Sequence, residues 1–166
     1  MEYSKNLNDH LTPNFVKKEF DCRCNRCRIT KHDPELSSKL QILRDYTGKE
    51  VIPTSGYRCP EHNAEVGGGT QSYHMVGKAC DFVIFDMNVS EICKICEAIG
   101  FNGIGMYDDG YVHVDVRPAS AKYFWHNSDS NPVTTFGGKN LKIDVEKPNN
   151  SLANDIINVL KKHGYI

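Results

Sequence analysis

The sequence has almost no excess of charge of either sign. It carries 20 Lys and Arg residues against 21 Asp and Glu residues among 166, for a formal net charge of −1. A nucleic-acid-binding protein that works through a strongly basic face, or a polybasic membrane anchor, is therefore not expected. The sequence also lacks any apolar stretch near the roughly 18–20 residues needed to cross a bilayer. We accordingly expect no nucleic-acid partner and no membrane insertion.

A secretory leader is also missing from the pattern at the N-terminus. Residues 1–6 contain no basic segment followed by an apolar core, so we expect synthesis in the cytoplasm without a signal peptide. The seven cysteines are an odd number, which excludes a complete set of internal disulfides. In a reducing compartment these thiols are expected to be free, metal-bound or redox-active.

The composition that is present, 39% hydrophobic and 25% charged, is typical of one soluble globular domain. Asp33 and Pro34 form a helix start that precedes a stripe of leucines, and Gly48 follows the end of that helix. Ser90 is expected to cap a second helix, which Gly100 ends. Short strands are expected at residues 51–54, 79–84, 104–107 and 111–117, with a hairpin turn at 108–110.

The character of the chain changes after Pro118. Residues 119–140 are polar and contain an aromatic run at 123–125, which we interpret as packing beside the site rather than as a sugar platform. An alternating segment at 141–145 predicts a strand, and 151–163 predicts an amphipathic helix. We therefore expect a core at residues 1–118 and a short C-terminal β-α extension at 119–166 that packs on it.

The strongest chemical signal lies in the strand expected at 111–117. Side chains alternate across a strand, so the valines at 112, 114 and 116 share one face and belong in the core. Tyr111, His113, Asp115 and Arg117 share the opposite face. A strand with an apolar back and a polar front presents either a site or a solvated edge.

A second signal is His74, followed by Asp81 on the next expected strand. Asp81 lies among apolar neighbours in the sequence, where a carboxylate is costly unless it is paired or bound to a metal. Two histidines and one aspartate would suit zinc, with one position left for water. Such an ion would lower the pKa of bound water and polarise a carbonyl. Taken alone, His74 and Asp81 could equally be residues with ordinary hydrogen-bond partners.

Three motifs in this region resemble one family. Ser72-x-His74-x-x-Gly77-x-Ala79-x-Asp81 is similar to the signature of the zinc D-Ala-D-Ala carboxypeptidase and L-alanyl-D-glutamate endopeptidase family, the LAS metallopeptidases. Residues 54–63 resemble its S-G-Y-R-x-P-x-x-N segment, and residues 103–117 resemble its closing strand pair. The resemblance covers about residues 14–118. It implies the Hedgehog/DD-peptidase fold, an α+β domain with a small antiparallel sheet flanked by helices.

The resemblance also implies roles for individual residues. His74, Asp81 and His113 would be the three zinc ligands. Arg58 resembles the arginine that binds substrate in this family, in keeping with the fit of a guanidinium to a carboxylate. Alternatively, Arg58 forms an ordinary surface salt bridge. Ser72 would touch substrate or support its loop, and Tyr111 is a candidate substrate-binding residue on the polar strand face.

The sequence departs from the family at the acidic general base. Its usual position, three residues before the last histidine ligand, is occupied by Gly110. Asp115 shares the face of His113 and could act as the base or orient that ligand. Asp109 could reach the site from the turn. Both remain candidates for catalytic involvement, together with Arg58.

A separate cysteine cluster, Cys22-x-Cys24-x-x-Cys27, could supply three thiolates to a second, structural zinc. The fourth ligand would come from Cys59, Cys80 or His32. We interpret the cluster as a structural set of thiols, with the second zinc as the alternative interpretation.

The function implied by the resemblance is a zinc metallopeptidase that hydrolyses peptide bonds in bacterial peptidoglycan stem peptides. It would be a D,D-carboxypeptidase or an L,D- or D,D-endopeptidase. Without a signal peptide it would suit a phage endolysin, reaching the cell wall through a holin-made hole or on lysis. The alternative is a non-catalytic, zinc-stabilised cell-wall-binding or structural module of the same fold, which Gly110 favours. We expect a monomer rather than an oligomer.

Overall fold

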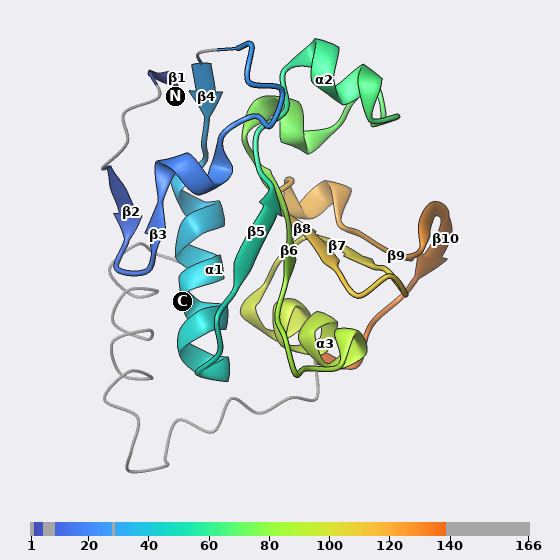
Figure 1. The fold of residues 1–166 in the computed structure, drawn as a ribbon. Helices are drawn as coiled ribbons and strands as arrows, with labels where there is room; N and C mark the ends of the chain where they lie inside the picture. Colours follow the sequence, from blue (N-terminus) through green and yellow to red (C-terminus); the bar gives the residue numbers. More distant parts are fainter. Residues whose placement is uncertain (1, 5–8, 28, 139–166) are drawn as a thin grey trace.

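A six-stranded sheet forms the centre of the fold, with the strand order β10-β9-β7-β8-β6-β5 (Figure 1). The computed structural model describes residues 2–4, 9–27 and 29–138. Neighbouring strands are antiparallel except β7 and β9, which run parallel. The strands are β5 (Ile52–Ser55), β6 (Ala79–Val83), β7 (Gly103–Met106), β8 (Val112–Asp115), β9 (Tyr123–His126) and β10 (Ser128–Val133).

The α+β class is as expected and compatible with a Hedgehog/DD-peptidase-like fold, and the expected small antiparallel sheet contains one parallel pair, β7 and β9. The parallel pair arises after β8, which ends beside the start of β7, because residues 116–122 carry the chain past that end of β7 to its other edge. Tyr123 then lies opposite Gly103, and β9 runs in the same direction as β7. The aromatic run expected in the C-terminal extension is thereby part of the central sheet.

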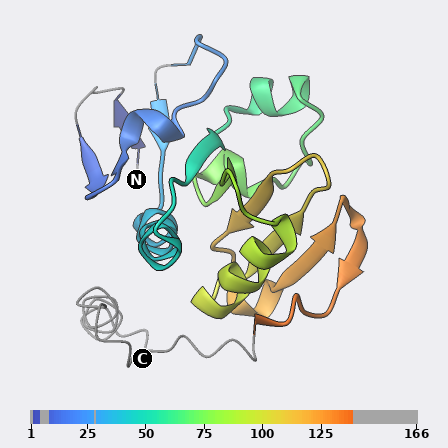
Figure 2. The ribbon, with the colours of Figure 1, turned by 60° about the horizontal axis from the view of Figure 1, so that its bottom comes forward.

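Two longer helices pack with the sheet around one core. The first, α1 (Pro34–Thr47), begins where the Asp33 side chain accepts a hydrogen bond from the Glu35 N–H, and ends at Gly48 with φ of 64°. The second, α3 (Val89–Ile99), lies across the strands, and α1 is seen end-on beside it (Figure 2). Its cap is Asn88 rather than Ser90, because the Asn88 carboxamide accepts from the Ser90 N–H.

The core confirms the alternation expected for β8. Val112 and Val114 are buried with exposures of 1% and 0%, and they join Leu40 of α1 and Ile92 of α3 in one cluster. This burial leaves the opposite face of β8 to His113 and Asp115. The sheet face away from the helices therefore carries the polar residues that the sequence singled out.

Smaller elements complete the described part of the chain. The short helix α2 (Pro60–Glu65) follows β5. None of the described helices is both long and apolar enough to cross a membrane. The strand at 141–145 and the helix at 151–163 that the sequence predicts lie outside the described residues. The remaining elements are β1 (Glu2–Ser4) paired with β4 (Ile29–Lys31), β2 (His10–Thr12) paired with β3 (Phe15–Val16), α2 (Pro60–Glu65), and 3-10 turns at Lys17–Phe20, Tyr73–Val76 and Ala119–Ala121.

His32, directly before the cap of α1, is a buried histidine with 3% exposure. Its ring packs against Phe20 at a centroid distance of 4.7 Å. Within the part of the chain that the structure describes, neither of its ring nitrogens has a hydrogen-bond partner. Burial penalises the imidazolium form and lowers the pKa of His32 to about 4, although the neighbouring Asp33 opposes this shift.

This burial predicts a loss of stability in mild acid. Above pH 6.5 His32 is neutral in both folded and unfolded chains, but below it only the unfolded chain takes up the proton readily. The free energy of unfolding should therefore fall as the pH drops from 6.5 to 4. At pH 5, His32 should account for a loss of about 2 kcal/mol relative to neutral pH. Denaturant unfolding of the wild type and of His32→Leu at pH 7 and pH 5 measures this. An equally steep decline in His32→Leu would contradict the assignment to His32.

Candidate active site

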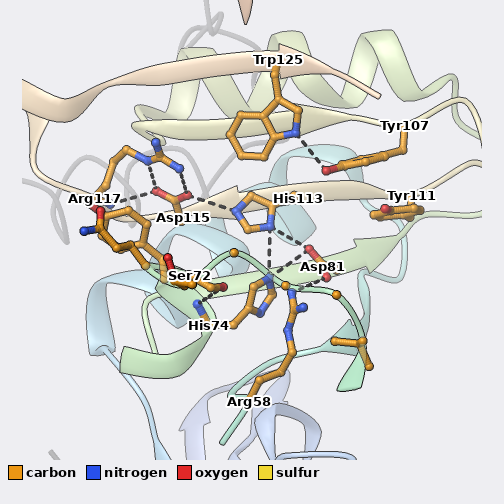
Figure 3. Close-up of a pocket in the computed structure, with 17 residues that line it drawn as sticks. Arg58, Ser72, His74, Asp81, Tyr107, Tyr111, His113, Asp115, Arg117 and Trp125 are labelled. Carbon is orange, nitrogen blue, oxygen red and sulfur yellow. Dashed lines mark hydrogen bonds and ion pairs between the residues drawn. The ribbon is translucent and has the colours of Figure 1, made fainter. Parts of the chain in front are cut away.

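Three side chains that the sequence predicts as metal ligands converge on one point of the polar sheet face (Figure 3). Asp81 of β6 lies directly opposite His113 of β8 in the antiparallel register. His74 enters from the 3-10 turn Tyr73–Val76 that precedes β6. The Nδ1 atom of His113 is 2.8 Å from the Asp81 carboxylate, and the Nε2 atom of His74 is 3.2 Å from the same Nδ1 and 3.3 Å from the same carboxylate.

The donor atoms of this cluster fit a zinc ion. Tetrahedral coordination at roughly 2.0–2.1 Å places neighbouring ligand atoms about 3.3 Å apart, close to the separations in the His74, Asp81 and His113 cluster. Two imidazole nitrogens and one carboxylate oxygen also form a donor set suited to zinc, and three protein ligands leave a coordination position open.

The surrounding backbone determines which nitrogen His74 presents. Its Nδ1 lies 2.7 Å from the Gly56 carbonyl oxygen, to which it donates, so that Nε2 faces the cluster with its lone pair. The Ser72 hydroxyl accepts a hydrogen bond from the His74 N–H and begins the turn, and Ser72 also lines the cavity. Gly77 ends the turn with φ of 74°, and a Cβ there would collide with the backbone of Lys31.

Asp115 contacts the nitrogen of His113 that points away from Asp81. The Nε2 atom of His113 lies 3.0 Å from one Asp115 oxygen, which leaves Nδ1 for the cluster. Arg117 grips the same carboxylate with both its Nε and a terminal nitrogen, at 2.7 and 2.6 Å. Asp115 is completely buried, and both of its oxygens are engaged. Of the two roles that the sequence left open for Asp115, this geometry favours orienting the ligand.

Burial disfavours the charged form of each residue in the cluster, whereas ion pairing favours it, and the balance differs from residue to residue. Burial lowers the pKa of His74. For His113, burial also disfavours the charged form, but hydrogen bonds to Asp115 and Asp81 outweigh it and raise the pKa to about 9. For Asp81, burial is outweighed by the two histidines, and its pKa is lowered. A metal that binds here must therefore displace a proton from His113.

The β7–β8 turn explains why an acidic residue is absent from its usual position. Gly110 adopts φ of +94°, a conformation that L-residues rarely take. Asp109, the candidate base in the same turn, is exposed and is not among the residues that line the cavity. Asp108 instead contacts His126 and Asn127. Tyr111 does line the cavity, where its ring stacks on Tyr107 at 4.2 Å.

A cavity of about 710 Å³ opens over the cluster, and its mainly polar wall includes three tyrosines and one tryptophan. The tryptophan is Trp125 of β9, with its ring centroid 5.0 Å from that of His113 and its indole N–H donating to the Tyr107 hydroxyl at 2.9 Å. A Cβ on Gly105 would lie 2.5 Å from this indole, so the glycine makes room for it. The sequence predicted only that Trp125 packs beside the site. The alternation that sets Tyr123 and Trp125 on one strand face could have indicated that both face the cavity side of the sheet.

Arg58 lies at the edge of the cluster and lines the same cavity. One of its terminal nitrogens is 3.3 Å from the second oxygen of Asp81. The structure thus places Arg58 in the cavity wall, where its ion-pair partner is the predicted metal ligand Asp81. Arg58 therefore orients Asp81.

The comparisons with known proteins bear on this site as a whole. The family model described as peptidase M15 matches residues 13–115, a range that contains all three converging ligands and Asp115. The chain belongs to the peptidase M15 family. Over 107 residues it is 36% identical to the peptidoglycan L,D-endopeptidase MepK of Escherichia coli K12, an alignment that covers 60% of this chain and 58% of that protein.

A second similar protein is the probable peptidoglycan L,D-endopeptidase MepK of Haemophilus influenzae. It is 31% identical over 119 residues, which cover 65% of this chain and 64% of that protein. The chain thus matches somewhat less than two thirds of the length of either relative.

The arrangement around His113 predicts that Asp115 supports metal binding and that Asp109 does not. Loss of a carboxylate that orients a histidine ligand typically weakens metal affinity by about 10–100-fold. We expect Asp115→Asn to raise the zinc dissociation constant by at least about tenfold. Asp109→Asn should leave it unchanged. Competition with a chromophoric chelator measures both, and circular dichroism checks the fold. Unchanged affinity in Asp115→Asn would contradict the orienting role.

Proposed function

We propose that this protein is a zinc-dependent peptidase that hydrolyses peptide bonds in bacterial peptidoglycan stem peptides. The observation that carries the proposal is the convergence of His74, Asp81 and His113 at the floor of an open cavity. Membership of the peptidase M15 family and the names of the two relatives support it. A zinc ion in such a site supplies Lewis-acid activation of water and of a peptide carbonyl.

The chain's own residues provide the positioning for this chemistry. Asp115 and Arg117 hold the His113 ring, the Gly56 carbonyl holds the His74 ring, and Arg58 holds Asp81. Burial and the neighbouring Tyr107 raise the pKa of Tyr111, which therefore keeps its proton at neutral pH. From the cavity wall Tyr111 is available to donate a hydrogen bond to a substrate oxygen.

Cleavage of an internal bond fits this cavity better than removal of a terminal residue. A carboxypeptidase needs a cation for the terminal carboxylate of its substrate. Among the residues that line the cavity, the two arginines are Arg58 and Arg117, and each is paired with a carboxylate of the site itself. We therefore propose an endopeptidase, and the names of the relatives support a bond between an L- and a D-configured residue.

The second candidate is a module that binds zinc and cell wall without hydrolysis. The observation in its favour is Gly110, since the left-handed backbone at the usual position of the general base disfavours an acidic side chain there. Asp81 and Asp115 are the carboxylates among the cavity-lining residues, and both are engaged within the cluster.

Digestion of purified peptidoglycan distinguishes these candidates. The zinc-loaded protein should release peptides cut at an internal bond, identified by liquid chromatography and mass spectrometry, and should clear a suspension of cell walls. His113→Ala should lose both activities. Release of free D-alanine alone would indicate a carboxypeptidase instead. Zinc binding without any released product would favour the non-catalytic module, and equal activity in His113→Ala would contradict the proposed site.

A further inference from the structure

We propose that Cys22, Cys24, Cys27 and Cys59 bind a second zinc ion, at a site separate from the cavity and independent of the proposed activity. The sequence left the fourth ligand open among Cys59, Cys80 and His32. The structure brings Cys59 to the other three, and all four sulfur atoms lie within 4.8 Å of one another. His32 packs against Phe20 instead, and Cys80 is buried in the main core.

The separations between the sulfur atoms are those of a tetrahedral site. The Sγ of Cys59 lies 3.8 Å from the Sγ of Cys22 and 3.8 Å from that of Cys24, and the Sγ of Cys24 lies 3.5 Å from that of Cys27. Four thiolates around zinc at about 2.3 Å would be about 3.8 Å apart. The cysteines are therefore spaced as ligands around a common centre, with their sulfur atoms pointing at one another.

The backbone around Cys24 is shaped to stabilise a thiolate. The N–H groups of Arg26 and Cys27 both point at the Cys24 sulfur, at 3.4 Å each. Asn25 adopts φ of 56°, which folds the Cys24–Cys27 loop back on itself. On the other side of the cluster, the Cys59 N–H donates to the Cys22 sulfur at 3.4 Å. Hydrogen bonds of this kind favour the charged form of the acceptor.

The donor set and its surroundings suit zinc. Four sulfur ligands select zinc or iron over magnesium and calcium. Cys22 and Cys59 are buried, with exposures of 2% and 6%, and Tyr57 packs against them. Four thiolates around a dication leave a charge of about −2. Arg26 interacts with Cys24 and can offset part of this charge, although its guanidinium is also paired with Glu65. Arg23 instead contacts the carbonyl oxygens of Glu19 and Pro53.

This site would tie the loop at residues 22–27 to the segment that supports the cavity. Cys59 is the residue before α2 and directly follows Arg58, whose guanidinium contacts Asp81. Three residues before Cys59, the Gly56 carbonyl orients His74. A zinc bound by the four cysteines would thus fix the backbone from which both of these contacts are made, without itself reaching the cavity.

Counting metal ions per chain tests the proposal. The full chain, purified from zinc-supplemented medium under reducing conditions, should contain two zinc ions by elemental mass spectrometry. His113→Ala and Cys24→Ser should each contain one, and the double variant none. Cys93→Ala removes a buried thiol of α3 outside the cluster and serves as the matched control, with two zinc ions expected.

A second measurement uses chains with all four cluster cysteines intact, so a folding defect in Cys24→Ser does not leave the proposal untested. Titration of His113→Ala with an organomercurial should release its zinc to a chromophoric indicator, because the remaining ion is held by thiolates. Cobalt substituted into the same variant should show sulfur-to-cobalt charge-transfer absorption. The proposal is overturned if His113→Ala contains no zinc, if it contains iron instead, or if non-reducing alkylation finds two disulfides among the four cysteines.

Discussion

The antiparallel register that sets Asp81 opposite His113 is the constraint on which the site depends. On β8 the valines at 112 and 114 face the core, and on β6 Cys80 and Phe82 do so. A slip of one residue between the strands would turn one of these apolar sets outward and one ligand inward. The burial of the core residues therefore also places the two ligands side by side. Ligand geometry is here a by-product of apolar packing.

The three converging side chains are each held on their far side by the chain itself. A carbonyl oxygen holds His74, a buried carboxylate with its arginine holds His113, and a second arginine holds Asp81. Such buried charges are costly unless every member has a partner. Here each charged group has an ion-pair partner, which favours one arrangement of the cluster before any ion binds, although the buried Nε of Arg58 has no hydrogen-bond partner among the described residues. This organisation reduces the rearrangement that metal binding requires.

Local patterns along the chain were sufficient for many elements. The first helix begins and ends at the residues that the capping signals indicated, because both caps are made by side chains and backbone within a few positions. The second helix begins earlier than expected, since Asn88 takes the capping role by accepting from Ser90, which by itself is also a good cap residue. Strand alternation alone was enough to separate the valine face of β8 from its polar face.

The sequence by itself determined the ligand types, their alternation on β8 and the glycine in the β7–β8 turn, because these depend on the two-residue period of a strand and on backbone preferences of single residues. Only the tertiary structure decided that Trp125 enters the cavity on a parallel strand, that Asp115 is locked behind His113 by Arg117, and that Cys59 joins the cysteines near residue 24. Two of these contacts depend on a crossover and on a loop closure over tens of residues. Neither the crossover nor the loop closure produces a periodic pattern in the sequence, because both depend on which distant segments the folded chain brings together.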